Sequence, residues 1–284
     1  MAKTETDGAT TYFDGAWVEG SPSIARANSH ALWMASTVFD GARAFDGVAP
    51  DLDRHCARVI ESAAAMGLRP TCTAAEIEAL VWEGIRRYPP ATALYICPMF
   101  FAEKGFIEPD PESTRFALAL YAAPLPAGGG FSACLSSFRR PAPDMAPTNA
   151  KAACLYPNVG RAIREAREKG FDSAVVLDPE RNVAEFAFMN LFVVKDDVVA
   201  TPAINGTFLN GITRQRVIGL LRDAGVPVTE RSIAFAELLE ADELFCTGNY
   251  AKVSPCRRLE DRELPAGPVF ERALSLYFDF ARGG

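Results

Sequence analysis

Apolar residues recur every three or four positions in residues 53–66, which predicts an amphipathic helix. Asp53 is placed to cap the start of this helix, and Gly67 is suited to end it. The apolar face consists of Cys56, Val59, Ile60, Ala63 and Met66.

A second helix is predicted over residues 74–87, because Thr73 and Glu76 have the spacing of a capping box. Two apolar segments follow, 92–100 and 116–122, and both predict buried strands. The N-terminal third therefore combines strands with helices.

Helices and strands alternate in the C-terminal half. One helix is expected over residues 157–169, before Gly170, and another after the turn at 210–213, before Gly225. Strands joined by short turns are typical of antiparallel hairpins, so we expect an α+β fold. The predicted strands are 174–177, 191–194 and 198–200.

Proline and glycine interrupt this pattern in residues 123–130, and both disfavour helix and sheet. We therefore expect a small N-terminal domain of residues 1–123, an interdomain linker of residues 124–135 and a larger domain of residues 136–284.

The composition excludes several classes of protein. A net charge of −7 over 284 residues disfavours nucleic-acid binding. No apolar run reaches the roughly 18 residues that span a membrane, and the N-terminus lacks the apolar core of a signal peptide. Seven cysteines without a C-x-x-C pair then indicate reduced thiols and a cytoplasmic protein. Two histidines, His30 and His55, argue against a metal site or a Ser-His-Asp triad.

Two charged residues lie in unusual surroundings. Lys151 has small or apolar neighbours, and desolvation makes a lysine amine available for Schiff-base chemistry. Glu185 stands among Val, Phe and Met, where a carboxylate needs a cationic partner such as a protonated pyridine nitrogen. The alternatives are an exposed loop lysine and a glutamate that faces water at a strand end.

Two glycine-containing segments could approach a ligand. Residues 209–214 form a turn into a helix, whose N-terminal N–H groups favour a phosphate, and the Thr213 hydroxyl can assist. In residues 245–251, Gly248 is flanked by small polar residues, as in loops close to a ligand. A plain helix cap and a plain turn remain alternatives.

Together and in this order, these four segments resemble the class IV aminotransferases, enzymes dependent on pyridoxal phosphate (PLP). Residues 38–45, VFDGARAF, are similar to the VFEGIRAY of the branched-chain group, and residues 95–98, YICP, to its YIRP. The resemblance covers about residues 12–265. It implies an α+β, two-domain PLP enzyme of fold type IV, like D-amino-acid aminotransferase, with a small N-terminal α/β domain and a larger PLP-binding domain.

The resemblance also implies roles in cofactor binding. Lys151 is the catalytic Schiff-base lysine, which also moves the proton between substrate Cα and cofactor C4′. Glu185 keeps the pyridine nitrogen protonated. Tyr156 bonds the 3′ oxygen and Leu209 packs on the ring. The phosphate is expected to be bound by Arg58, the backbone N–H of Ile212, Thr213 and Asn249.

The residues expected at the substrate are Met34, Phe39, Tyr95, Cys97, Asn249 and Tyr250. The backbone at Asn249 and Tyr250, with the Tyr95 hydroxyl, is expected to bind the α-carboxylate. Cys97 stands where the branched-chain pattern usually has arginine, and a thiol cannot bind the second carboxylate of glutamate. Arg139 and Arg140 are possible substitutes from the interdomain region.

Other departures concern the shape of the pocket. Met34 replaces an expected tyrosine, and Asn249 and Tyr250 replace a threonine and an alanine. Residues 185–188, EFAF, replace a pattern that is often Glu-Gly-x-Gly. Phe188, Met189 and Tyr250 either reshape the floor of the site or belong to the core. Residues 95–100 lack the arginine and histidine of the D-amino-acid group, which favours L substrates.

The function implied is amino transfer between an L-amino acid, branched-chain or hydrophobic, and a 2-oxo acid. The alternatives are an aminodeoxychorismate lyase, an amine or D-amino-acid transaminase, or a PLP-binding protein without activity. The resemblance further implies a homodimer, with Met34 crossing to the partner's site.

Overall fold

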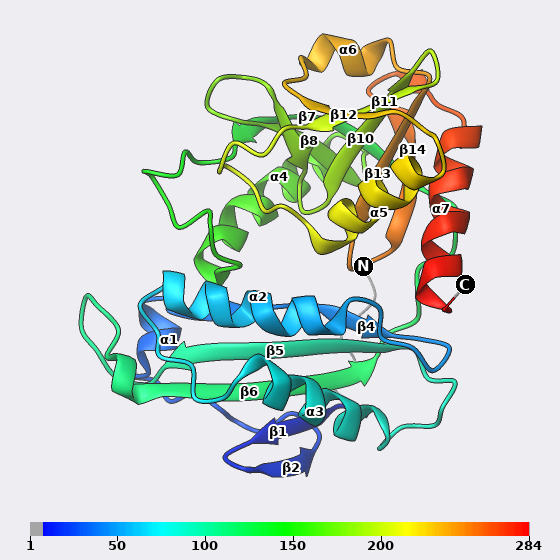
Figure 1. The fold of residues 1–284 in the computed structure, drawn as a ribbon. Helices are drawn as coiled ribbons and strands as arrows, with labels where there is room; N and C mark the ends of the chain where they lie inside the picture. The colour runs from blue at the N-terminus through cyan, green and yellow to red at the C-terminus, as the bar shows by residue number, and fades with distance from the viewer. Residues whose placement is uncertain (1–7, 284) are drawn as a thin grey trace. The chain divides into compact units, whose positions relative to one another are not determined.

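The computed structural model describes residues 8–283 (Figure 1). Its contacts group the chain into two compact units. Unit 1 comprises Met1–Leu125 and Ala150–Cys154, and unit 2 comprises Pro126–Asn149 and Leu155–Gly284. The short segment that carries Lys151 thus belongs to unit 1, although the chain on either side of it belongs to unit 2. The domain boundaries given above, with their linker at 124–135, stay a prediction.

Unit 1 is built on one antiparallel sheet, six-stranded within the described residues, in the order β2-β1-β6-β5-β3, with β4 also paired to β5. The two longest strands pair along their whole length, from Leu94↔Ala122 to Ala102↔Thr114. The strands are β1 (Thr10–Phe13), β2 (Ala16–Glu19), β3 (Val38–Phe39), β4 (Ala42–Ala44), β5 (Leu94–Ala102) and β6 (Thr114–Ala122).

The helices of unit 1 are α1 (His30–Trp33), α2 (Leu52–Ala65) and α3 (Ala74–Ile85), with a 3-10 turn at Pro111–Ser113. Helices α2 and α3 pack on each other and on β5. Their apolar faces and the sheet enclose one core, which includes Val59, Ile77 and Ile96. Ala150 and Ala152 belong to this same core, so the residues on both sides of Lys151 are anchored in unit 1.

Unit 2 contains a mixed sheet, nine-stranded within the described residues, in the order β12-β11-β10-β13-β14-β7-β8-β9, with β15 beside β14. Three pairs are parallel: β11 with β12, β14 with β7, and β7 with β8. The strands are β7 (Phe131–Arg139), β8 (Ser173–Leu177), β9 (Val183–Phe186), β10 (Asn190–Lys195), β11 (Val198–Pro202), β12 (Val228–Arg231), β13 (Glu243–Gly248), β14 (Lys252–Leu259) and β15 (Arg262–Glu263).

The helices of unit 2 are α4 (Tyr156–Glu168), α5 (Ile212–Asp223), α6 (Phe235–Leu239) and α7 (Pro268–Ala281), and a 3-10 turn spans Ala153–Leu155. Helix α4 packs on β7 and β8. Helices α5 and α7 pack on each other, and both pack on β13 (Figure 1). No helix in residues 8–283 is long and apolar enough to cross a membrane.

Most of the predicted elements are confirmed, with ends shifted by one or two residues. The capping box at Thr73 is present in full: Thr73 accepts from the Glu76 N–H, and the Glu76 carboxylate accepts from the Thr73 N–H. The cap predicted at Asp53 is wrong, because α2 begins one residue earlier and its N-cap is Asp51 in a left-handed conformation. The β10–β11 hairpin is antiparallel as expected, and β13 and β14 form a further antiparallel hairpin that was not predicted.

A buried carboxylate joins α2 to the turn between β3 and β4. Asp40 accepts from Arg58 through both oxygens, Nε to Oδ2 at 2.6 Å and a terminal nitrogen to Oδ1 at 2.8 Å. His55 Nδ1 lies 2.7 Å from Oδ1. Burial alone would raise the pKa of Asp40, but the charges and hydrogen bonds of Arg58 and His55 outweigh it and hold the pKa well below its ordinary value.

Replacing this carboxylate should destabilise the protein in a pH-dependent way. Because the folded pKa is lowered, the stabilisation is complete above the unfolded pKa of about 3.9 and is lost as the pH falls below it. Asp40→Asn should cost about 3 kcal/mol at neutral pH, as for a broken buried ion pair. Urea unfolding of the wild type and Asp40→Asn from about pH 7 to about pH 3 gives the free energy of unfolding of each. The difference between the two free energies should decrease only at the acid end of this range. Asp144→Asn, at an exposed aspartate, is the matched control. A loss of stability in Asp40→Asn that does not change with pH would contradict the assignment.

Candidate functional site

The backbone of Lys151 is fixed on both sides within unit 1. Its N–H donates to Ser62 Oγ at 3.0 Å, and its carbonyl accepts from the Phe39 N–H at 3.1 Å. Its ammonium lies 4.9 Å from the centroid of the Phe39 ring, within cation–π range. The side chain is half-buried, as its small neighbours suggested. The amine therefore projects from a rigid strand-like segment rather than from a loose loop.

Four more of the predicted residues lie near Lys151 in unit 1. Phe39 is in β3, and Asp40, the next residue, bonds both Arg58 and the carbonyl of Pro98 in β5. Pro98 follows Cys97, and the charges of Asp40 and Lys151 both affect the pKa of the Cys97 thiol. Tyr95, two residues earlier in β5, stacks on Tyr121 with ring centroids 5.3 Å apart.

The Cys97 thiol stays neutral at physiological pH. Burial, with the Asp40 carboxylate adding to it, raises the pKa of this thiol to about 12. A neutral thiol carries no positive charge for a substrate carboxylate. This agrees with the expectation that Cys97 cannot replace the arginine of the branched-chain pattern. Met34 ends α1 and is 36% exposed.

In unit 2, Glu185 is buried on β9 and has a cationic neighbour that the sequence did not identify as such. Arg140 Nε lies 3.5 Å from Glu185 Oε1 and donates to the carbonyl of Thr207 at 2.9 Å. Arg140 therefore links Glu185 to the segment that leads into Leu209. Arg139 is exposed and donates to the carbonyl of Pro179. The structure thus ties both arginines to unit 2 contacts of their own, which weakens their candidacy as binders of a substrate carboxylate.

The turn into α5 is held against the start of β10. Asn190 Nδ2 donates to the carbonyl of Leu209 at 3.1 Å. A Cβ at position 211 would collide with the side-chain oxygen of Asn190, so any other residue there would require the Asn190 amide to move. Gly211 is the N-cap of α5 and brings no side chain to the first N–H groups of the helix. Ile212 and Thr213, both buried, begin the helix beside these groups.

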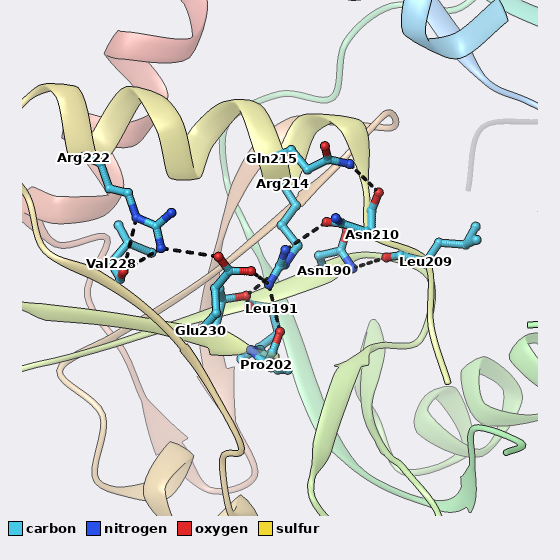
Figure 2. A network of polar contacts seen from close by, with 11 residues as sticks. Asn190, Leu191, Pro202, Leu209, Asn210, Arg214, Gln215, Arg222, Val228 and Glu230 are labelled. Atoms are coloured by element: carbon cyan, nitrogen blue, oxygen red, sulfur yellow. Dashed lines mark hydrogen bonds and ion pairs between the residues drawn. The ribbon is translucent and has the colours of Figure 1, made fainter. Parts of the chain in front are cut away.

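The same turn is held from below by Arg214, a fully buried residue to which the sequence assigned no role (Figure 2). Its terminal nitrogens donate to Asn210 Oδ1, to the carbonyl of Pro202 and to Glu230 Oε2, each at 2.9 Å. Gln215 Nε2 also donates to the carbonyl of Asn210, as Figure 2 shows. The direction in which the α5 N-terminus points is therefore set by several hydrogen bonds. The sequence offers one indication that Arg214 binds the turn: the guanidinium of an arginine can donate several hydrogen bonds at once.

The β13–β14 hairpin brings Asn249 and Tyr250 to the same end of the sheet. Thr247 of β13 pairs with Asn190, the residue that holds the turn before α5. Tyr250 lies against Phe188, with ring centroids 6.4 Å apart in an edge-to-face arrangement. Both rings are nearly half exposed, so they are not core residues. Tyr156 is the first residue of α4 and is half-buried.

The residues of unit 2 suit the parts of PLP. A phosphate needs convergent N–H donors, which the uncapped N-terminus of α5 and the Thr213 hydroxyl provide. A protonated pyridine nitrogen needs a buried carboxylate, which Glu185 provides. Within unit 1, Lys151 carries an amine and Arg58 a guanidinium that donates to Asp40. No group of three or more His, Cys, Asp or Glu side chains in residues 8–283 is placed to hold a metal ion.

Comparisons with known proteins agree with this chemistry. A family model described as "Amino-transferase class IV" matches residues 37–259. The branched-chain-amino-acid aminotransferase of Pseudomonas aeruginosa is 32% identical, over 100% of this chain and 96% of its own length.

Solved structures give the same result. An aminotransferase from Brucella abortus, bound to PLP, is 51% identical with a TM-score of 0.96, over 97% of this chain and 99% of that one. The branched-chain aminotransferase of Thermoproteus uzoniensis, solved with norvaline, is 32% identical with a TM-score of 0.90, over 97% and 96%. The expected α+β fold of type IV is confirmed. The chain belongs to the PLP-dependent class IV aminotransferases.

Proposed function

We propose that this aminotransferase acts on hydrophobic L-amino acids, above all the branched-chain ones, with a 2-oxo acid as acceptor. The observation that carries the proposal is the pair of uncharged groups beside the Lys151 ammonium: the Phe39 ring, whose centroid is 4.9 Å away, and the neutral thiol of Cys97. The nearby Asp40 carboxylate is already paired with Arg58 and His55. Such surroundings suit an apolar substrate side chain and penalise a second carboxylate. The relatives named for branched-chain substrates support the same choice.

The roles proposed for the cofactor-binding residues are those that the family resemblance implies. Arg58, the Ile212 N–H, Thr213 and Asn249 bind the phosphate, and Leu209 packs on the ring. Glu185 would face the protonated ring nitrogen, and Arg140 Nε, 3.5 Å from Glu185 Oε1, places a positive charge beside this carboxylate. Tyr156 bonds the 3′ oxygen.

When bound, PLP supplies an aldehyde that accepts the amino group and a ring that delocalises the electrons released at Cα. Lys151 would hold the cofactor through its amine, and this amine, once freed, would carry the proton that leaves the substrate Cα. The bonds of its backbone to Ser62 and Phe39 fix the point from which the Nζ atom swings. Orientation of this kind lowers the cost of bringing the amine to both carbons.

The substrate is bound through its α-carboxylate by the backbone of Asn249 and Tyr250 and the Tyr95 hydroxyl. Met34, Phe39 and Cys97 are neutral neighbours for the side chain. We also propose that the enzyme is a homodimer with Met34 crossing to the partner's site. Large exposed apolar side chains support an interface on unit 1: Leu32, Trp33, Phe106 and Ile107.

Removing the proposed amine or carboxylate should separate cofactor binding from turnover. Lys151→Ala should lower kcat on the order of 10³-fold or more, because no other group takes over proton transfer. Glu185→Gln should still bind PLP but lose about 10²-fold in kcat, because a neutral amide does not stabilise a protonated ring nitrogen. Visible absorption and steady-state kinetics measure both effects. Lys104→Ala and Glu180→Gln, at exposed residues, are matched controls; wild-type rates in the Lys151 or Glu185 variants would refute these roles.

Single amino donors should distinguish the substrate classes. With no oxo acid present, L-leucine, L-isoleucine or L-valine should abolish the visible band of the bound cofactor, whereas L-glutamate should do so poorly. Cys97→Arg should improve the reaction with L-glutamate about tenfold or more, because an arginine can bind the second carboxylate. Cys97→Ala, which adds no charge, should not. A band lost with D-alanine or a simple amine would support a D-amino-acid or amine transaminase, and pyruvate formed without an acceptor would support the lyase.

A further inference from the structure

Lys252 is a buried lysine to which the proposed function gives no task. Only 1% of the residue is exposed. Its ammonium donates to Asn249 Oδ1 at 2.9 Å and lies 6.0 Å from the centroid of the Tyr277 ring in α7. Burying an ammonium costs free energy unless nearby groups compensate its charge. The presence of a lysine at this position therefore needs an explanation.

The backbone at this position does not provide that reason. Gly248 and Lys252 are the last paired residues of the β13–β14 hairpin, and Lys252 has a φ of 62°. Glycine and asparagine adopt this left-handed conformation most readily, whereas a lysine there costs about 1 kcal/mol. A glycine or an asparagine would form this turn at lower cost. The explanation for the lysine must therefore lie in its side chain.

The contact with Asn249 gives the side chain a defined effect. An asparagine amide has an oxygen that accepts and an NH₂ group that donates, and the two ends look alike in shape. An ammonium has only donors, so the atom that faces Lys252 must be the oxygen. The amide is thereby turned in one sense, with its NH₂ group directed away from the ammonium.

The hairpin lies where an anion is expected. Thr247, two residues before Asn249, pairs with Asn190, and Asn190 holds the turn that opens α5. The N-terminus of α5 and the hairpin are therefore fixed to the same residue of β10. An amide whose NH₂ group is turned away from the Lys252 ammonium is suited to an anion such as a phosphate and unsuited to a cation.

We propose that Lys252 is a positioning residue that fixes Asn249 as a hydrogen-bond donor to the phosphate of PLP. This inference rests on the proposed function, in which Asn249 binds that phosphate. The ammonium adds a positive charge behind the amide, which strengthens its N–H groups as donors and favours an anion in front of them.

The inference predicts a loss of affinity confined to ligands that carry the phosphate. Lys252→Met should raise the Kd of the full-length protein for PLP about tenfold, the size of one charge-assisted hydrogen bond. The Kd for pyridoxal, which lacks the phosphate, should change less than about twofold. Lys252→Gln keeps an amide donor at a similar reach, so it should restore about half of the lost binding energy. Absorbance titration with PLP and with pyridoxal measures these constants.

A double-mutant cycle tests whether Lys252 acts through Asn249. If it does, Lys252→Met should add less than about twofold to the effect of Asn249→Ala. Unchanged PLP affinity, equal losses for PLP and pyridoxal, or fully additive effects would each overturn the inference. A wild-type protein that shows no visible band with PLP would instead refute the proposed function. Melting temperatures of all variants identify any general loss of folding.

Discussion

Asn190 connects three segments of unit 2 at one end of its sheet. As the first residue of β10 it pairs with Thr247 of β13, and its amide donates to the carbonyl of Leu209. Its oxygen also occupies the space that any side chain at position 211 would need. Because Gly211 caps α5, one side chain determines both the residue at the cap and the place where the helix begins. The helix N-terminus and the β13–β14 turn are thus organised before any ligand arrives, which lowers the entropic cost of binding.

The same end of unit 2 depends on cations that are buried and paired. Arg140 donates to the carbonyl of Thr207, Arg214 to that of Pro202, and Lys252 to the side chain of Asn249. Each charge would be expensive in an apolar interior, and each is compensated by oxygens of nearby turns. Positive charges fixed in this way act together with the dipole of α5. Arg140 and Arg214 are paired with Glu185 and Glu230, so the charges of these two cations are largely balanced within the fold.

The sequence predicts local features of this fold better than distant ones. The capping box at Thr73 depends on residues three positions apart, and it is present as predicted. Helix α7 was not predicted, although its buried residues Val269, Ala273 and Tyr277 recur at helical spacing. The bonds of Arg140 to Thr207 and of Arg214 to Pro202 and Glu230 could not be predicted, because these partners lie 12 to 67 residues away in the chain. The family resemblance pointed to Lys151 and Glu185 as candidates, but nothing in it pointed to Arg214 or Lys252.

Phe188 and Tyr250 show how two departures from a family pattern can be coupled. Each is an aromatic residue where the related pattern has a small one, and 62 positions separate them in the chain. In the structure they form one edge-to-face pair, 45% and 46% exposed, at the end of the sheet that carries Asn249. A single large residue there would leave an unsupported ring, whereas two rings hold each other. Their exposed faces then form one aromatic surface at this end of the sheet, and a change at either position would remove the support of the other ring.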